Sequence, residues 1–427
     1  MNFREQLEIE NFLTIKNAVV DIRPFTILIG PEATGKSVIA KVLYFFRGLL
    51  SDGQFVNSIT TQESLSTFEE HFLERFEKIF PRYTWENQKF SLTLRTDNWE
   101  FRLVRRERSG HNCDIELRCS DGVADLFRRA QDKWNLLSGS KELATSHLLD
   151  SQSVQAFSNA LEEMKVEAKL TAAFNQSIFI PAGRSFFANL RRNIFSFLAN
   201  DIPLDLFMKE FGSVYEKSRP FFGFYPRTQH YFSNEKIQEE VEKILSGKYL
   251  HADGQDWIIS KRGKINLTEA SSGQQEALPL LCILSAALHR FRSEETITFL
   301  IEEPEANLFP VSQRKLVNIF SMSQEMRHRF VLTTHSPYIL TALNSLILAS
   351  NISEREPDAK AAAKSIISPA EPVRFDDVSA YTINDGHLTS IMDNESRLIG
   401  NSIIDSVSDE FESVANNLLK LSLSRAS

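Results

Sequence analysis

The stretch GPEATGKS, residues 30–37, places two glycines, a lysine and a serine in the pattern G-x-x-x-x-G-K-[ST]. An apolar run, FTILI, precedes it, and a run with helical spacing, VIAKVLYFF, follows it. In a strand–loop–helix context the backbone N–H groups of such a loop enclose a phosphate, and the start of the helix adds positive potential. We therefore predict a nucleoside triphosphate site in which Lys36 contacts the β- and γ-phosphates and the Ser37 hydroxyl holds Mg²⁺. The predicted loop comprises Gly30, Pro31, Glu32, Ala33, Thr34, Gly35, Lys36 and Ser37.

A pair of carboxylates ends a second apolar run, in TITFLIEEPEANLFP at residues 296–310. Ligands of α/β sheets bind at the carboxyl ends of the strands, where these two side chains would lie. Hydrolysis of a triphosphate needs one carboxylate to hold Mg²⁺ through its water shell and another to polarise the attacking water. We assign the first role to Glu302 and the second to Glu303, whose direction Pro304 would fix. An acidic surface turn is the alternative interpretation.

His335 follows a third apolar run, in RFVLTTHSPYIL. A lone histidine is more often structural than catalytic. This one ends the strand that comes after the acidic strand, which would bring it to the same cleft. There its imidazole can hydrogen-bond the γ-phosphate and orient the attacking water.

Ser271, Ser272 and Gly273, in EASSGQQEALPLL, open a predicted helix. A helix N-terminus attracts an anion, yet the loop at residues 30–37 already accounts for the triphosphate of this chain. The spare anion site predicts that a second subunit contributes its own nucleotide. We therefore expect a homo-oligomer, a dimer or a higher assembly, with ATP bound between subunits.

The composition is that of a globular chain with ample core, because 42% of its 427 residues are hydrophobic. A net charge of −8 argues against a surface coated with basic residues for nucleic acid, although it allows a local basic groove. The three cysteines, Cys113, Cys119 and Cys282, lack metal-site spacing, which favours a reducing compartment. No apolar signal core opens the sequence, and its longest apolar run is too short to span a bilayer, so we expect a cytoplasmic protein that does not enter a membrane.

Hydrophobic periodicity along the chain predicts an α/β fold. Period-two alternation indicates antiparallel strands before the glycine loop and again between residues 89 and 119. Residues 350–373 have the composition of a surface loop or loose helix, and a final helix is expected from about residue 398. The predicted organisation is a first ATPase lobe at 1–120 with a helical excursion at 51–88, a helical insertion at 121–176, a return strand at 177–184, a phenylalanine-rich helical insertion at 185–250, and a second ATPase lobe at 251–427.

Two compositional features bear on partners. The chain has 33 phenylalanines, and their crowding in residues 185–250 is typical of a core or, alternatively, of an oligomer or effector surface. Basic residues cluster at three places, where a solvated face is the default and a DNA groove would need several clusters on one surface. These clusters are Arg102, Arg105, Arg106 and Arg108; Arg184, Arg191 and Arg192; and Lys261, Arg262 and Lys264.

The four motifs, in this order, resemble those of ABC-type ATPases. ASSGQ resembles the signature, FLIEEPEANL the Walker B motif and D-loop, and TTHS the switch histidine. The chain is most similar to the RecF/SMC-like branch, and within it to the OLD-type ATPases, through Asn11–Phe12, Glu302–Ala306, His335–Pro337 and the stretch FIPAGR at 179–184. The resemblance covers the beginning and the last third of the chain. It implies a P-loop NTPase fold of the ABC-ATPase type, with an antiparallel β subdomain and helical insertions.

The same resemblance assigns further residues. It implies that Asn11 and Phe12 contact the nucleotide, and our candidate for the Q-loop glutamine is Gln176. The sequence departs from the family pattern at Ser272, where the signature has glycine, and at Glu302, where most members have aspartate.

The choice within the branch rests on what surrounds these motifs. No heptad pattern long enough for the coiled-coil arms of SMC proteins is present. OLD nucleases carry a TOPRIM domain after the ATPase, whereas the 92 residues after His335 contain no strand-borne D-x-D pair for two metals. We therefore expect an ATPase without a nuclease of its own, acting on a separately encoded effector.

Stand-alone ATPases of this kind occur in bacterial anti-phage defence, and the chain resembles most the PARIS-type ATPase, with PtuA of Septu second. The resemblance implies a sensor or scaffold subunit that controls a toxic nuclease, with a phage-encoded protein as a possible trigger. A RecF-type repair ATPase that clamps duplex DNA is the alternative, and a nucleotide switch that barely hydrolyses ATP is a third interpretation. Given the acidic net charge, we expect DNA binding to be weak and dependent on salt.

Overall fold

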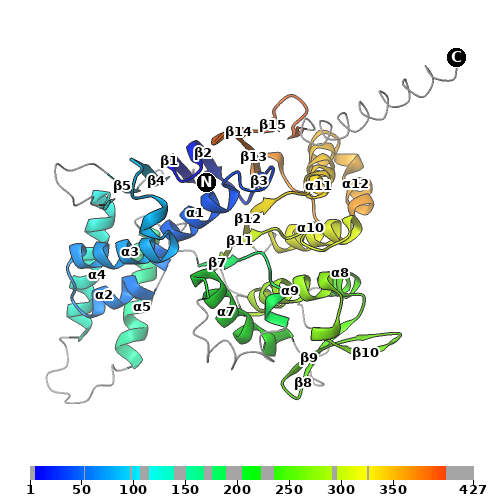
Figure 1. Cartoon of the computed structure of the whole chain (residues 1–427), viewed down its shortest axis with the longest axis horizontal. Coiled ribbons are helices and arrows are strands. Elements are labelled where there is room, and N and C mark those ends of the chain that lie inside the picture. The colour runs from blue at the N-terminus through cyan, green and yellow to red at the C-terminus, as the bar shows by residue number, and fades with distance from the viewer. Residues whose placement is uncertain are drawn as a thin grey trace.

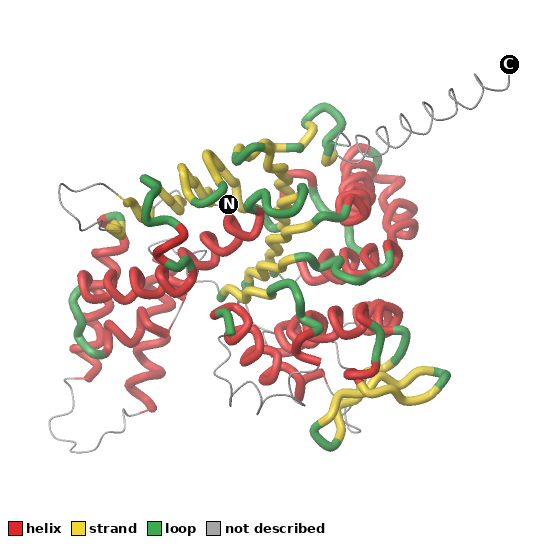
Figure 2. Tube along the Cα trace, in the orientation of Figure 1, coloured by secondary structure: helices red, strands yellow, loops and turns green. Residues whose placement is uncertain are grey.

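The computed structural model describes residues 5–51, 53–96, 99–105, 115–138, 151–167, 176–188, 204–222, 235–290, 296–324 and 327–400. Within these residues one large mixed sheet runs through the molecule, with helices on both of its faces (Figures 1 and 2). Its strands are β1 (Glu5–Phe12), β2 (Ile15–Ile22), β3 (Phe25–Ile29), β4 (Ser91–Thr96), β5 (Glu100–Arg105), β6 (Ile115–Cys119), β7 (Ser177–Ile180), β11 (Thr298–Glu302), β12 (Arg329–Thr334), β13 (Val378–Asn384) and β14 (His387–Ser390).

The order of the strands divides the sheet into two parts. The order is β6-β5-β4-β1-β2-β14-β13-β3-β12-β11-β7. From β13 to β7 all neighbours are parallel, and β3 and β11 are buried along their whole length, as parallel strands covered on both faces must be. From β6 to β2 all neighbours are antiparallel, and β2 alternates between buried and exposed residues. The α/β fold and its antiparallel β subdomain are thus confirmed.

Helices cover both faces of the sheet. They are α1 (Lys36–Ser51), α2 (Gly53–Thr60), α3 (Leu65–Ile79), α4 (Asp121–Ser138), α5 (Ser151–Glu167), α7 (Leu206–Phe222), α8 (Glu235–Leu245), α9 (Ser272–Arg290), α10 (Pro310–Gln324), α11 (Pro337–Arg355) and α12 (Lys360–Ile367), with 3₁₀ turns η1 (Arg82–Thr84), η2 (Leu267–Glu269), η3 (Pro357–Ala359) and η4 (Phe375–Asp377). Ile27 packs into the core beneath α9, α10 and α11, while its neighbour Leu28 packs into the core around α1. Adjacent side chains of β3 therefore belong to two different hydrophobic cores, one on each face of the sheet.

Helices α2 to α5 come from two separate stretches of sequence and pack together beside the antiparallel strands (Figure 1). In α3, Phe68, Phe72 and Phe76 recur at four-residue spacing and are all buried, which explains why this segment is a helix with one apolar face. The side chain of Ser64 caps α3 by accepting a hydrogen bond from the N–H of Thr67. The excursion at 51–88 and the insertion at 121–176 thus share one apolar core.

A small sheet lies beside α8 and α9. It contains β8 (Lys248–Ala252), β9 (Gln255–Ser260) and β10 (Gly263–Asn266), in the order β10-β9-β8. Strand β8 begins inside the segment 185–250, which was expected to be helical. In that segment Phe207 and Phe211 are buried and Phe187 packs against the core, so these three phenylalanines belong to the core. Residues 189–203 and 223–234 lie outside the described residues, and a partner surface there stays a prediction.

Two expectations concern the part of the chain near its C-terminus. Residues 350–373, expected to be a surface loop or a loose helix, are mostly helical: α11 continues to Arg355 and α12 follows, with Ala363 buried. The final helix does not begin at 398, since β16 (Leu398–Ile399) pairs with β15 (Met392–Asp393). Residues 401–427, where the rest of that helix was predicted, lie outside the described residues. No helix in the described part of the chain has the length and apolar character needed to cross a membrane.

Candidate functional site

The carboxyl ends of neighbouring parallel strands bring the predicted motifs together. In the sheet register, Ile29 at the end of β3 pairs with Thr334 at the end of β12, and Glu302 at the end of β11 pairs with Thr333. The glycine loop follows β3, the acidic pair spans the last residue of β11 and the residue after it, and the switch histidine follows β12. They therefore lie along one edge of the sheet, where ligands of α/β folds bind.

The second glycine of the loop, Gly35, has a backbone conformation and surroundings that only glycine allows. Gly35 has φ +103°, and a Cβ there would lie 2.5 Å from Cδ1 of Ile15 and 2.7 Å from Oγ1 of Thr14. Both reasons exclude a larger residue. The loop consequently turns tightly against the β1–β2 connection and leads straight into α1, as the strand–loop–helix prediction required.

The side chain of Lys36 folds back over the first residues of the glycine loop. Its Nζ donates hydrogen bonds to the carbonyl oxygens of Gly30 at 2.8 Å and Pro31 at 2.6 Å. Burial lowers the pKa of the Lys36 ammonium, and the nearby carboxylates of Glu32 and Glu303 oppose that shift. The site thus holds a buried ammonium group beside the loop, where an anion would compensate its charge.

Glu302 and Glu303, at the carboxyl end of β11, differ in their surroundings. Glu302 is only 8% exposed, and its Oε2 accepts a hydrogen bond from the N–H of Ala182 at 3.4 Å. Its Oε1 is buried and has no hydrogen-bond partner among the described residues. Glu303 is more exposed and has φ +44°, with its N–H donating to the carbonyl of Thr333 at 2.8 Å. A buried carboxylate oxygen without a donor fits a cation or its water shell, whereas Glu303 reaches the solvent side of the site.

His335 lies between the glycine loop and the acidic pair. Its Nε2 is 3.7 Å from Oε1 of Glu303, and its Nδ1 is 3.7 Å from Oε1 of Glu32. His335 therefore lies beside Glu303, as the order of the strands led us to expect. Its contact with a γ-phosphate stays a prediction.

Glu305 is a site residue that our sequence analysis missed. Its Oε1 accepts hydrogen bonds from Oγ1 of Thr334 and from the backbone N–H of His335, both at 2.7 Å. These bonds fix the backbone from which the switch histidine projects. The signal was present in the sequence, because Glu305 is the third carboxylate of EEPE.

Ser271, Ser272 and Gly273 stand at the N-terminus of α9, as predicted, and both serines are exposed. Ser271 and Gln274 form a reciprocal cap, in which the side chain of each residue accepts a hydrogen bond from the backbone N–H of the other. A Cβ on Gly273 would lie 2.6 Å from the carbonyl oxygen of Asn307, so the signature packs directly on the D-loop. No described contact joins these residues to the glycine loop of the same chain.

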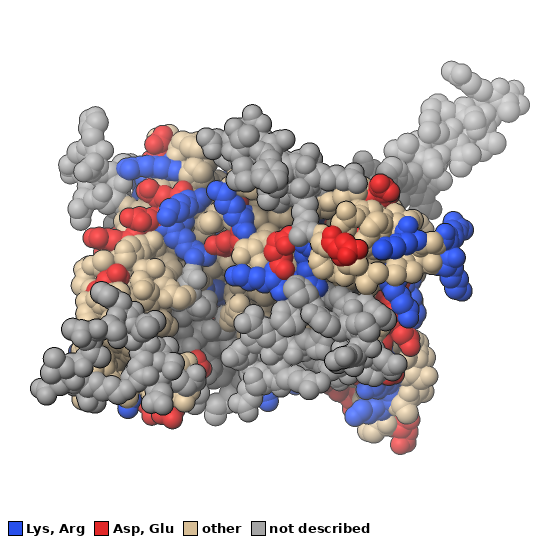
Figure 3. Space-filling model, turned by 90° about the horizontal axis from the view of Figure 1, so that it is seen from below, with Lys and Arg blue, Asp and Glu red and all other residues tan. Residues whose placement is uncertain are grey.

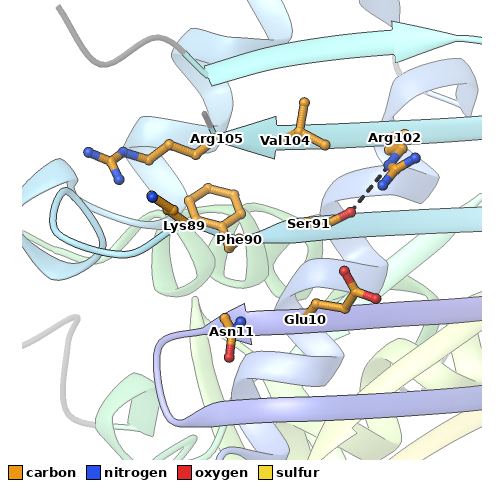
Figure 4. A pocket seen from close by; sticks show the side chains of 8 residues that line it. All are labelled: Glu10, Asn11, Lys89, Phe90, Ser91, Arg102, Val104 and Arg105. Carbon is orange, nitrogen blue, oxygen red and sulfur yellow. Dashed lines mark hydrogen bonds between the residues drawn. The ribbon is translucent and has the colours of Figure 1, made fainter. Parts of the chain in front are cut away.

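Asn11 and Phe12 have different environments. Phe12 is fully buried, and its ring contacts those of Phe76, Phe80 and Phe90, so its side chain belongs to the core and does not contact a nucleotide. Asn11 is exposed and lines a pocket of about 240 Å³ at the same edge of the sheet (Figure 4). The pocket is lined by Glu10, Asn11, Lys89, Phe90, Ser91, Arg102, Val104 and Arg105.

Two other assignments from the sequence are wrong. Gln176 precedes β7, with its carbonyl accepting from the N–H of Thr298, so it lies at the opposite edge of the sheet. The length of β7 separates it from the site by roughly 13 Å, too far for a Q-loop glutamine. Arg184, which we grouped with basic surface residues, is fully buried. Arg191 and Arg192 lie outside the described residues.

Comparison with known proteins places these motifs in a family. A sequence model of the AAA ATPase domain matches residues 5–340, which is most of the chain. The chain belongs to the AAA ATPase domain family. No curated protein matches it as a relative. It is therefore an ATPase-type chain whose P-loop and Walker B motifs both lie within the matched region.

Solved structures with a similar fold include heads of SMC proteins. The SMC head domain from Thermotoga maritima is 10% identical, with a TM-score of 0.37, and the match covers 92% of this chain and 98% of that one. The Smc head domain with an extended coiled coil from Pyrococcus furiosus, bound to the C-terminal domain of ScpA, is 13% identical with a TM-score of 0.37, covering 96% and 100%. An SmcHead bound to the C-winged helix domain of ScpA is 14% identical with a TM-score of 0.39, covering 92% and 99%.

Proposed function

We propose that this AAA ATPase domain binds and hydrolyses ATP in a site completed by a second copy of the chain. The observation that carries the proposal is the convergence of Lys36, Glu303 and His335 at one edge of the sheet. The loop and Lys36 would bind the triphosphate, since backbone N–H groups and an ammonium are its natural partners. Glu303 would accept the proton of the attacking water, and His335 would contact the γ-phosphate.

Magnesium fits the residues present. The Ser37 hydroxyl is exposed at the start of α1, and the unpartnered Oε1 of Glu302 supplies a second oxygen, directly or through water. Hard divalent cations take oxygen ligands, usually few from the protein together with phosphates and waters. When bound, the ion would neutralise charge on the phosphates.

The pocket at Asn11 is our candidate for the base and ribose. It adjoins the β1–β2 connection, whose Thr14 and Ile15 contact Gly35 of the glycine loop. Its polar side chains, among them Asn11, Lys89 and Arg102, offer hydrogen bonds to a base or a ribose (Figure 4). A nucleotide with its phosphates on the loop would extend along the same edge of the sheet toward this pocket.

The difference between Asn11 and Phe12 gives a testable pair of variants. Asn11→Ala is expected to raise the Kd for ATP by roughly two- to tenfold, the worth of a single hydrogen bond, without loss of stability. Phe12→Ala is expected to lower the free energy of unfolding by about 3–5 kcal/mol, because it leaves a cavity in an aromatic core. Denaturant unfolding and nucleotide titration measure the two effects. An unchanged Kd in Asn11→Ala would contradict the pocket assignment.

A second copy is supported by what surrounds the site. The signature serines are exposed and make no described contact with the glycine loop of their own chain. Large apolar side chains are also exposed at the N-terminal ends of the two helices that follow β11 and β12. They are Phe309 and Val311 at the start of α10 and Tyr338 at the start of α11. Exposed aromatic residues beside polar groups are typical of interfaces. An ATP-bound dimer would cover both features.

The biological role that we propose is a sensor or scaffold subunit in anti-phage defence, controlling a separately encoded nuclease. It rests on the resemblance of GPEATGKS and FIPAGRSFF to such ATPases. The RecF-type alternative requires a basic groove. Arg184 is buried and Arg105 donates to the carbonyl of Gln88, so these two members of the basic clusters offer no free cation to DNA. On the face shown in Figure 3, described basic and acidic side chains are interleaved.

Purification of the tagged chain from its native host, followed by mass spectrometry and nucleic-acid analysis of what binds, tests this role. We expect a nuclease subunit to be bound, and any DNA to be lost at physiological salt. The Lys36→Ala variant serves as the nucleotide-free control. A tight, ATP-dependent complex with duplex DNA and no protein partner would instead favour the repair ATPase.

A further inference from the structure

Arg184 is a buried junction between the acidic pair and the signature helix. Its side chain is fully buried behind the site. Nη1 donates hydrogen bonds to the carbonyl oxygens of Pro181 at 2.9 Å and Glu302 at 2.8 Å, and Nη2 donates to that of Glu303 at 2.9 Å. Nε donates to the carbonyl of Glu276 at 3.1 Å. One guanidinium group therefore joins three backbone segments that are distant in sequence.

The other half of the junction is the carboxylate of Glu276, in the second turn of α9. Its Oε2 accepts from the backbone N–H of Arg184 at 3.0 Å, and its Oε1 accepts from that of Ser185 at 3.1 Å. Glu276 is itself buried and lies five residues after Ser271. Helix α9, which presents the signature, is thus bound to the segment of Arg184 through both the backbone carbonyl and the side-chain carboxylate of Glu276.

The backbone of Glu303 is where this junction meets the proposed chemistry. Glu303 has φ +44°, a conformation that residues with a side chain seldom adopt and that persists only when neighbouring contacts hold it. Its N–H is held by Thr333, while its carbonyl accepts from Arg184 and from the N–H of Ala306. Loss of the Arg184 bond would let the peptide relax and turn the carboxylate away from the position it now occupies.

We propose that Arg184 is a positioning residue that sets the direction of the Glu303 carboxylate and couples it to the signature helix. The inference rests on the proposed role of Glu303 as the general base. Docking of the signature on a nucleotide of a second copy would require α9 to shift. Because Glu276 of α9 binds Arg184, and Arg184 binds the carbonyl of Glu303, such a shift would move the backbone of Glu303. Arg184 contacts no part of the glycine loop in the described structure, so ATP binding does not depend on it.

The central test is Arg184→Lys, which keeps the charge and loses the planar fork. We expect kcat to fall by about 10- to 100-fold, the usual cost of displacing a reacting group by about 1 Å, while the KM for ATP stays within about threefold of wild type. Arg219→Lys is the matched control, since Arg219 is also a buried arginine and pairs with Asp256 away from the site. If both variants keep their thermal midpoints and lose activity equally, or if kcat of Arg184→Lys is unchanged, the positioning role is wrong.

A double variant separates this inference from the proposal on which it rests. In a Glu303→Gln background, Arg184→Lys should slow hydrolysis by no more than about twofold further, because both changes act on the same group. Losses that multiply would overturn the coupling to Glu303. Wild-type turnover in Glu303→Gln alone would instead overturn the general-base assignment. Glu276→Gln is the second variant if Arg184→Lys does not fold, because it keeps the shape of the junction. We expect it also to lower kcat without raising the KM for ATP. An unchanged kcat in Glu276→Gln would show that the junction does not position Glu303.

Discussion

Glu303→Gln is expected to bind ATP as the wild type does and to hydrolyse it about 10²–10⁴-fold more slowly. Glutamine keeps the shape of the side chain but cannot accept the proton of the attacking water. The neighbouring Nε2 of His335, 3.7 Å from the carboxylate, would keep its place. The variant should therefore accumulate the ATP-bound, closed form. Phosphate release under single-turnover conditions, together with ATP titration, measures both parts of this result.

The control for Glu303→Gln is Glu356→Gln, which removes one exposed carboxylate at the far end of α11 and should leave turnover unchanged. Normal turnover in Glu303→Gln would place the general base elsewhere. Glu302 would then be the first alternative, since its Oε1 has no partner among the described residues. A Glu303→Gln variant that no longer binds ATP would show that the carboxylate supports the loop and is not a base.

The motifs were predictable because each is defined by chemistry that is local in sequence. The positive φ of Gly35 and its close approach to Ile15 are requirements of one residue on its own backbone, and only glycine meets them. The apolar runs that end at Glu302 and just before His335 likewise predict where two strands end. Since the carboxyl ends of parallel strands share one edge, the convergence of these residues followed from a fold class that the alternation of elements already indicated.

The errors concern residues whose role depends on packing between distant segments. Gln176 was assigned by its nearness to FIPAGR, but the direction of β7 carries it to the wrong edge. Arg184 looked like a surface cation because arginine is seldom buried, and its partners Glu276 and Glu303 lie some hundred residues away in the chain. Phe12 is buried by phenylalanines of α3 and its surroundings, which no local pattern links to β1.

The second large effect is expected when two inactive variants are mixed. Lys36→Ala removes the ammonium that now binds the loop carbonyls, so it should lose ATP binding. Ser271→Arg leaves the loop intact and places a bulky cation on the exposed N-terminus of α9. If the signature of one subunit completes the nucleotide site of the other, each variant alone is inactive. A mixed dimer then contains one site in which both halves are intact.

Random exchange of subunits should restore up to about a quarter of the wild-type rate per chain in a two-fold dimer, since half of the dimers are mixed and each has one good site. Ser365→Arg, the same change at an exposed position on α12, should remain fully active on its own. Exchange is verified with differently tagged chains. Confirmed exchange without any recovery would mean that the signature does not act in trans or that both sites must work together. Normal hydrolysis by Ser271→Arg alone would contradict the shared site directly, because the bulk of an arginine side chain at this position would keep the N-terminus of α9 away from the partner's nucleotide.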